Sequence, residues 1–132
     1  MLVLDTHALV FLALAPHRLP AAAAEAIETA ALEGRLACSD VSLWEIATLV
    51  ARGRLIVPVQ CEDFLHDLIA AFDVRVLPVT PAVAQAAQAP ELQQADPADR
   101  LIAATALSQR AGLVSGDALL AAALPDTVLW AH

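Results

Sequence analysis

Short apolar runs alternate with longer stretches of helical periodicity along the chain. The short runs predict buried strands at Met1–Leu4, Leu36–Ser39, Val74–Leu77, Gly112–Ser115 and Thr127–Trp130. The longer stretches predict helices at His7–Ala15, Pro20–Leu32, Val41–Ala51, Glu62–Phe72, Thr80–Ala89, Asp96–Ala111 and Asp117–Leu124, with a polar loop at Gln88–Ala95. Strands that alternate with helices form βαβ units. We therefore expect a three-layer α/β/α sandwich with a central parallel sheet, as a single domain over residues 1–132.

The composition limits the class of protein. Apolar residues make up 59% of the chain and charged residues 17%, so enough surface can be buried to exclude intrinsic disorder. Two cysteines are too few for a disulfide scaffold. Every apolar run is interrupted well before the roughly 18 residues that a membrane span needs. The opening MLVLDTH also lacks the basic segment of a signal peptide. We expect a cytoplasmic protein with no membrane partner.

The charge balance is acidic. Seven basic residues, all of them arginine, stand against fifteen acidic residues, which gives a net charge of −8. This balance argues against a protein that grips nucleic acid through a broad basic face. It leaves room for an enzyme that contacts a few phosphates through arginines and metal ions. The absence of lysine excludes a receiver-like phospho-acceptor domain, because such domains hold their phosphoryl group with a lysine.

Acidic residues gather where the predicted sheet presents the carboxyl ends of its strands. Asp5 and Asp117 follow the first and fourth strands, and Glu45 lies early in the helix after the second. Asp96 and Asp99 open the helix that leads into the fourth strand. Ligands bind at this edge of an open parallel sheet. Close carboxylates repel one another unless a cation neutralises them, and Mg²⁺ or Mn²⁺ suits oxygen ligands. The pattern predicts a metal site.

The same acids also have a structural interpretation, as helix caps. Ser42 and Glu45 have the spacing of a capping box, with Glu45 in the third helical position. The Asp96–Asp99 segment fits an N-cap followed by proline and an acid in the first turn. Asp117 follows a glycine and suits an N-cap. Asp5 caps no predicted helix, and the convergence of four separate segments favours the metal site over four unrelated caps.

Five stretches of the chain carry a family likeness, and they occur in the order LVLDTHALVFL, VSLWEIATLV, DPADRLIAATAL, GLVSGDALL and TVLWAH. They cover nearly the whole chain and resemble the PIN-domain ribonucleases, most of all the VapC-type toxins of bacterial toxin–antitoxin pairs. The resemblance implies that Asp5, Glu45, Asp99 and Asp117 are the acids that bind Mg²⁺ or Mn²⁺ and cleave RNA. Asp96 matches a supporting acid outside the ligand set, although it could exchange roles with Asp99.

The resemblance also implies supporting hydroxyl groups and shows one departure. Thr6 and Ser115 match positions that orient acids or water, and local hydrogen bonding at turns explains them equally well. Relatives often carry a histidine before the Asp-Pro step and an aromatic residue after it. Here Gln93–Gln94 and Ala98 stand at those places. We therefore expect this loop to contact the substrate more weakly or in a different way.

The activity implied by the resemblance is that of a metal-dependent endoribonuclease, the toxin of a toxin–antitoxin pair, with a cognate antitoxin protein as partner. The Val41–Ala51 and Glu62–Phe72 helices are more apolar than one sheet face requires, which predicts a homodimer. Two alternatives stay open. One is a catalytically silent PIN-fold binding module, which the full set of acids disfavours. The other is a PIN nuclease of RNA processing, which the small size disfavours.

Four further residues have competing interpretations. His7 is expected to pack on its helix surface rather than bind metal. Trp44 is expected to anchor a core or an interface rather than stack on a nucleobase. Cys38 lies in a predicted strand and is expected to be a buried small apolar residue. Arg100 fits a pair with Asp96 and a phosphate contact equally well.

Overall fold

Five parallel strands form the central sheet of the computed structural model, which describes residues 1–130. The strands are β1 (Leu2–Leu4), β2 (Leu36–Ser39), β3 (Arg75–Leu77), β4 (Gly112–Val114) and β5 (Val128–Leu129), in the order β3-β2-β1-β4-β5. All four pairings between neighbours are parallel, which confirms the predicted sheet. Ala131 and His132, at the end of the TVLWAH stretch, lie outside the described residues.

Helices connect the strands along the described chain. They are α1 (Thr6–Leu14), α2 (Ala21–Leu32), α3 (Asp40–Ala51), α4 (Cys61–Phe72), α5 (Pro81–Ala86), α6 (Pro97–Ser108) and α7 (Ala118–Ala123), with short 3₁₀ turns η1 (Pro16–Arg18) and η2 (Pro90–Leu92). No helix within residues 1–130 has the length and apolar character needed to cross a bilayer. Each predicted helix is present, with ends that shift by at most three residues.

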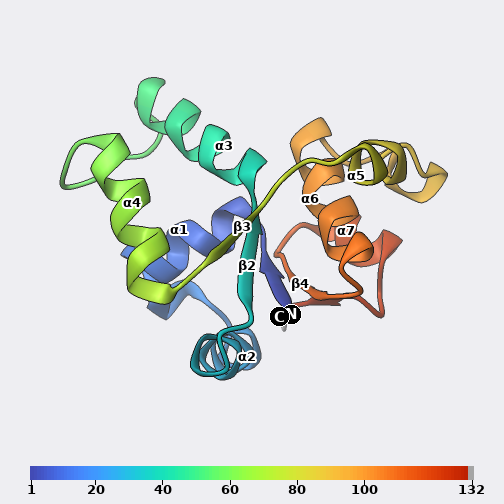
Figure 1. Cartoon of the computed structure of the whole chain (residues 1–132), viewed down its shortest axis with the longest axis horizontal. Helices are drawn as coiled ribbons and strands as arrows, with labels where there is room; N and C mark the ends of the chain where they lie inside the picture. The colour runs from blue at the N-terminus through green and yellow to red at the C-terminus, as the bar shows by residue number, and fades with distance from the viewer. Residues whose placement is uncertain (131–132) are drawn as a thin grey trace.

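The sheet separates two layers of helices, as Figure 1 shows. Along β1 the side chains alternate, so that Leu4 packs in one core cluster and Val3 in the other. The Leu4 cluster includes residues of α1, α2, α3 and α4, while the Val3 cluster includes residues of α6 and α7. Val83 of α5 packs against Ala104 on the outer side of α6. The three-layer α/β/α sandwich is therefore confirmed.

Two departures from the prediction have identifiable reasons. The helix expected to reach Ala111 ends at Ser108, because Arg110 adopts a left-handed φ of 51°. The Ala111 amide then bonds back to the Ala106 carbonyl at 2.9 Å, which is typical of a helix end. The polar loop predicted before α6 contains η2, whose Leu92 is fully buried in the core. A single large apolar residue between Glu91 and Gln93 gave no periodic signal.

The strand order reverses between β1 and β4. From β1 the chain proceeds outward to β2 and β3 on one side, while β4 and β5 occupy the other side. Such a reversal leaves a crevice at the carboxyl ends of the two central strands, where open α/β sheets bind their ligands. Asp5 directly follows β1, and Asp117 lies shortly after β4. The topology therefore brings both acids to the crevice.

Candidate metal and nucleic-acid site

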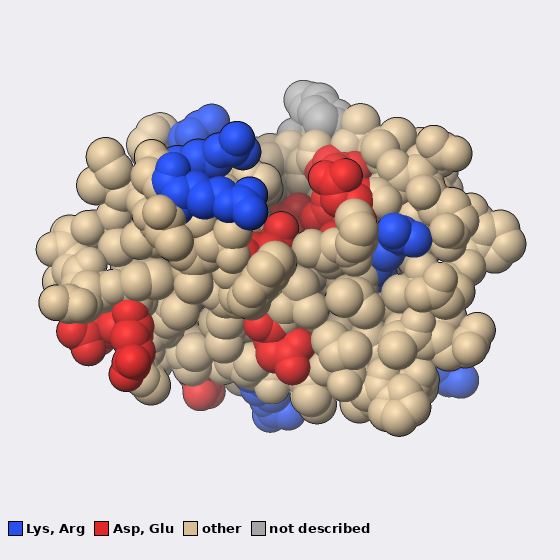
Figure 2. Space-filling view, turned by 90° about the horizontal axis from the view of Figure 1, so that it is seen from above, with Lys and Arg blue, Asp and Glu red and all other residues tan. Residues whose placement is uncertain are grey.

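A cavity of about 390 Å³ opens at this crevice, and we call it the acidic cavity. It is lined by Asp5, His7, Phe11, Asp96, Asp99, Gly116, Asp117 and Trp130. Figure 2 looks onto this edge of the molecule and shows acidic side chains gathered along its middle, with basic side chains to either side. Four of the five acids that the strand-end argument singled out therefore share one cavity.

Asp5 is held in place by the start of α1. Its carboxylate accepts a hydrogen bond from the Ala8 amide at 2.8 Å, so Asp5 is the N-cap of that helix. The expectation that it caps no helix is wrong, because α1 begins at Thr6 rather than at His7. Asp5 is 4% exposed. Burial raises its pKa above the ordinary value, while hydrogen bonds from Ser115 and the Ala8 amide act in the opposite direction.

Glu45 is positioned by a hydroxyl group of α1. The Thr6 hydroxyl donates a hydrogen bond to Oε1 of Glu45 and lies 3.1 Å from the Ser42 hydroxyl. The capping-box interpretation of Ser42 and Glu45 is wrong, because α3 begins at Asp40 and its cap is Ser39, which accepts from the Val41 amide at 3.2 Å. Glu45 therefore lies in the second turn of α3, where its side chain reaches α1 instead of its own helix end.

Asp96 and Asp99 stand one turn apart at the start of α6. Asp96 occupies the N-cap position, but its side chain makes no capping hydrogen bond. Asp99 is the third residue of the helix, and it lines the acidic cavity together with Asp96. The capping interpretation is therefore correct for the position of Asp96 and wrong for its side chain, which leaves that carboxylate available for other contacts.

Asp117 is both a cap and a cavity residue. Its carboxylate accepts from the amides of Leu119 and Leu120 at 2.8 and 3.0 Å, which confirms it as the N-cap of α7. The fully buried Ser115 accepts from the Asp117 amide at 3.1 Å. Because Ser115 also hydrogen-bonds to Asp5, one hydroxyl group links the acid after β1 to the acid after β4.

Electrostatic repulsion converges on Asp99. Burial, followed by the negative charges of Asp117, Glu45, Asp5 and Asp96, raises the pKa of Asp99 to about 7. No arginine or histidine is among the causes of this shift. The charge of Glu45 therefore acts on Asp99 together with the charges of the other three acids, although Glu45 does not line the cavity itself. The cluster thus holds more negative charge than its protein neighbours neutralise.

A hard divalent cation fits this cluster in chemistry and in charge. Carboxylate oxygens are the ligands that Mg²⁺ and Mn²⁺ prefer, and a cation would remove the repulsion that holds Asp99 partly protonated. Within residues 1–130, however, no three His, Cys, Asp or Glu side chains are placed closely enough to hold an ion. Binding would therefore have to draw the carboxylates inward, most simply by side-chain rotation of Asp99 and Asp96, which make no capping bonds.

An aromatic wall borders the cavity and was not anticipated from the sequence. The rings of Phe11 and Trp130 lie 6.5 Å apart, and the ring of His7 lies 6.4 Å from that of Phe11. The contact of His7 with Phe11 agrees with the expectation that His7 packs on its helix surface. The exposed His7 ring also lines the acidic cavity. Gly116 provides room for Trp130, since a Cβ atom there would stand 2.9 Å from the indole. In the sequence, the Gly116-Asp117 step before α7 was the feature that could have indicated this close packing.

The expectations for Trp44, Cys38 and Arg100 have different outcomes. Trp44 is 66% exposed, so a core role is wrong and an interface role stays a prediction. Cys38 is buried as predicted, and burial followed by the charge of Asp40 raises its pKa to about 12. Within the described chain Arg100 forms no ion pair with Asp96 and donates instead to Gln93 at 3.2 Å. The paired interpretation of Arg100 is therefore wrong.

Known proteins share both this sequence pattern and this fold. The PIN domain family matches residues 2–123. Ribonuclease VapC22 of Mycobacterium tuberculosis is 38% identical over 116 residues, which cover 87% of this chain and 85% of the relative.

Solved structures support the same architecture. VapBC2 from Rickettsia felis, bound to a promoter DNA fragment, has a TM-score of 0.74 at 19% identity, over 98% of both chains. FitAcB from Neisseria gonorrhoeae has a TM-score of 0.67 at 22% identity, over 98% of this chain and 96% of that one. A toxin–antitoxin complex from Klebsiella pneumoniae has a TM-score of 0.63 at 17% identity, with the same coverage. From the family match and the sequence identity we conclude that the chain belongs to the PIN domain family.

Proposed function

We propose that residues 1–132 act as a single endoribonuclease domain that depends on Mg²⁺ or Mn²⁺ and serves as the toxin of a toxin–antitoxin pair in the cytoplasm. The observation that carries the proposal is the position of Asp99, in a cavity at the strand-order reversal, where burial and then the charges of neighbouring carboxylates raise its pKa to about 7. Membership of the PIN domain family and 38% identity with Ribonuclease VapC22 support RNA as the substrate.

Each acid has a defined task in this proposal. Asp5, Asp99 and Asp117 would hold the ion, and Glu45 would complete the set or orient the attacking water. When bound, the ion supplies a hydroxide nucleophile near neutral pH and neutralises charge in the transition state. Thr6 fixes the direction of the Glu45 carboxylate through its hydrogen bond. Asp99 must release its proton before it can act as a ligand.

The bond changes follow from hydrolysis of a phosphodiester. The water oxygen bonds to phosphorus while the bond from phosphorus to the 3′ oxygen breaks. A proton passes to the leaving oxygen, so the products are a 3′-hydroxyl and a 5′-phosphate. Breakage of the bond to the 3′ oxygen is part of the proposal. It is checked by identifying the chemical groups at the ends of the RNA products.

The test compares the wild type with Asp5→Asn in Mn²⁺, on single-stranded and structured RNA. Asparagine caps helices as well as aspartate does, so the bond to the Ala8 amide survives while the charge is lost. Electrostatic stabilisation by the metal is worth several kcal/mol, and we expect cleavage to fall by about 100-fold or more. Equal cleavage by both proteins would rule out the metal site. Failure of the wild type to cleave RNA would favour the silent binding module.

An antitoxin protein is the proposed partner. The similar structure from Klebsiella pneumoniae is a toxin–antitoxin complex, and the acidic cavity suits a basic side chain supplied by such a partner. Expression of this chain alone should arrest growth, and co-expression with a cognate antitoxin should restore it. Asp5→Asn should not arrest growth. If the wild type leaves growth unchanged, the toxin role fails, whereas a nuclease acting in RNA processing survives.

A homodimer is also part of the proposal. Three large apolar side chains are exposed on α3 and on the loop that follows it. They are Trp44, Ile56 and Val59, at 66%, 88% and 47% exposure. Exposed apolar surface is typical of interfaces, so we propose α3 and this loop as the dimer contact.

A further inference from the structure

Two of the seven arginines contact or adjoin residues that line the acidic cavity. Arg18 in η1 places its guanidinium carbon 4.4 Å from the centre of the Phe11 ring, and Phe11 lines the acidic cavity. Arg18 is exposed, and it forms no ion pair within residues 1–130. The stacking on Phe11 fixes the plane of the guanidinium and leaves its N–H groups free to donate. Arg18 therefore presents a positive charge beside the acidic cavity.

Arg100 presents a second positive charge, on α6. It directly follows Asp99 and lines a smaller cavity of about 300 Å³ together with Gln88 and Pro97. Its Nη1 donates to Oε1 of Gln93, and the Gln93 amide is anchored by the carbonyls of Gln88 and Ala89 at 3.0 and 3.2 Å. Its Nε is buried and has no partner in the described chain. A guanidinium has five donors, and only one of them is used here.

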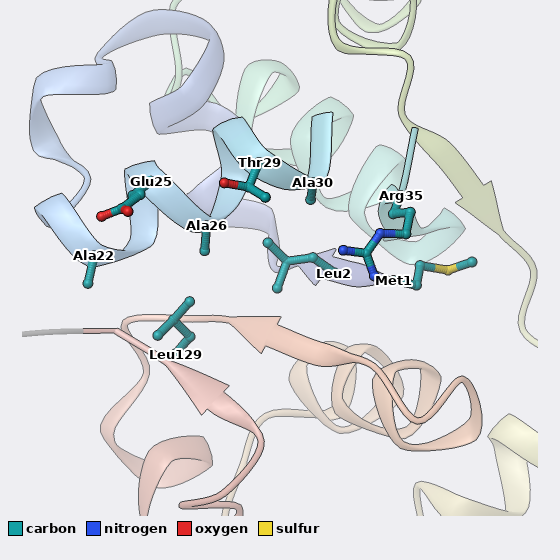
Figure 3. A pocket seen from close by; sticks show the side chains of 9 residues that line it. All are labelled: Met1, Leu2, Ala22, Glu25, Ala26, Thr29, Ala30, Arg35 and Leu129. Atoms are coloured by element: carbon teal, nitrogen blue, oxygen red, sulfur yellow. The ribbon is translucent and has the colours of Figure 1, made fainter. Parts of the chain in front are cut away.

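The placement of these two arginines differs from that of others in the chain. Arg35 pairs with Glu33 and lines a separate cavity between α2, the start of β1 and β5, shown in Figure 3. Arg110 lies just past the far end of α6. Arg18 and Arg100, in contrast, belong to segments on opposite faces of the sheet, with Arg18 stacked on Phe11 of the acidic cavity and Arg100 next to Asp99 in the sequence.

We propose that a single RNA strand crosses this edge of the molecule between Arg18 and Arg100, with the scissile phosphate in the acidic cavity and a flanking phosphate held by each arginine. The proposal rests on the nuclease function proposed above and adds the path of the substrate. Guanidinium groups match phosphate oxygens in geometry and charge. In a chain of net charge −8, such contacts offset the repulsion that RNA meets at the acids.

The arrangement favours RNA over an acidic peptide. A nucleic acid carries a phosphate on every nucleotide, so a strand with one phosphate at the acids brings others to both sides. Two cations on opposite sides of an anionic centre match that repeat. The hydrogen bond from Arg100 to Gln93 also gives a role to the loop before the Asp-Pro step, where this sequence has glutamines. Gln93 is then a positioning residue for the Arg100 phosphate contact.

The experiment measures the affinity for a short fluorescein-labelled single-stranded RNA of mixed sequence by anisotropy, over a series of KCl concentrations with Mn²⁺ present. All variants carry Asp5→Asn so that the RNA stays intact. Each phosphate contact contributes about 0.7 to the slope of log affinity against log salt for a single strand. Arg18→Gln and Arg100→Gln should each reduce the slope by about 0.7, and the double variant by the sum. The matched control Arg110→Gln, with the same charge loss just past the far end of α6, should leave it unchanged.

Further variants and readouts make the outcomes decisive. Arg100→Lys retains the charge, so its slope should match that of the parent. In proteins with Asp5 intact, Arg18→Gln and Arg100→Gln should raise KM and leave kcat unchanged. Unchanged slopes in both single variants overturn the proposal, as does a loss confined to antitoxin binding. If the wild type fails to cleave RNA while the slopes fall as expected, the nuclease function fails and the binding path stands.

Discussion

The Thr6 hydroxyl donates a hydrogen bond to Oε1 of Glu45, which joins the first residue of α1 to the second turn of α3 across 39 positions of sequence. Thr6 itself is buried, at 3% exposure. The bond fixes one carboxylate of the acidic cluster without using any of the other acids. A change at Thr6 therefore separates the orientation of Glu45 from its charge.

Thr6→Val should lower RNA cleavage. Valine has nearly the shape of threonine but cannot donate, so Glu45 loses its orientation while the fold is kept. Loss of such a supporting hydrogen bond at a metal site costs about 10–100-fold in activity. Thr6→Ser, which keeps the hydroxyl, is the control and should stay close to the wild type. Cleavage by Thr6→Val at the wild-type rate would show that the Thr6 bond has no part in the reaction.

The stability of the metal-free protein should decrease as pH rises toward 7. The pKa of Asp99 is raised from 3.8 to about 7, so between these values the native state holds a proton that the unfolded chain releases. Binding more protons in the native state makes the free energy of unfolding fall with pH in that window. Thermal melts in chelator should record a declining midpoint from about pH 4 to about pH 7.

The Asp99→Asn variant provides the control for this pH dependence. It cannot titrate, so its decline over the same window should be smaller, although the raised pKa of Asp5 contributes in the same direction. Near pH 7.5 the metal-free variant should be more stable than the wild type, because one source of repulsion is gone. Mn²⁺ should stabilise the wild type more strongly at the higher pH, since metal ligands must be deprotonated. A wild-type midpoint that rises through this window would contradict the assignment.

Asp5 should contribute to stability through its cap as well as to activity through its charge. Asp5→Ala removes the acceptor for the Ala8 amide, and loss of an N-cap costs about 0.5–2 kcal/mol. Asp5→Asn keeps the acceptor. Denaturant unfolding in chelator should therefore place Asp5→Ala below Asp5→Asn by about that amount. Equal stability of the two variants would mean that the cap contributes little.

Gly116→Ala should disturb the wall of the acidic cavity. The added Cβ would stand 2.9 Å from Cε2 of Trp130, so the indole must shift. Overpacking of this kind costs about 1–3 kcal/mol, and a drop in the unfolding midpoint should accompany a change in tryptophan fluorescence. Combining Gly116→Ala with Trp130→Leu should relieve the clash. If Gly116→Ala alone has no effect on either readout, the packing of Trp130 against Gly116 is not present in solution.

The proposed dimer contact predicts a change in oligomeric state. Trp44→Gln removes a large apolar side chain that is 66% exposed, and light scattering after size exclusion should show a shift from dimer to monomer. Leu119→Gln, at an exposed apolar position on α7, is the control and should leave the mass unchanged. A monomeric wild type would contradict the homodimer directly.

The sheet and its order of helices could be predicted from the sequence because parallel strands are buried on both faces. Runs such as Leu36–Ser39, which is buried at every position, are therefore apolar without alternation. The end of α6 could not be predicted, because it depends on the left-handed conformation of Arg110. The burial of Leu92 could not be predicted either, because a single apolar residue cannot show a helical or strand periodicity.

The acids of the cavity were identifiable because strand ends in a parallel sheet share an edge. Their local roles were less so. Ser42 stands three residues before Glu45, which is the spacing of a capping box. In the structure both side chains instead contact the Thr6 hydroxyl, and the spacing is the same in the two arrangements. Phe11 and Trp130 are separated by most of the chain, and only the folded structure brings their rings to within 6.5 Å. Side-chain partners of that kind leave no pattern in a single sequence.

The measurement that tests the account most directly is anomalous diffraction from a crystal soaked in Mn²⁺ near pH 7.5. We expect an anomalous peak in the acidic cavity, with carboxylate oxygens of Asp5, Asp99 and Asp117 at about 2.0–2.5 Å from the ion. The Asp99 side chain should have rotated toward the ion relative to its metal-free position. A crystal that binds manganese elsewhere, with these carboxylates apart and no peak between them, would contradict the claim that they share a cation.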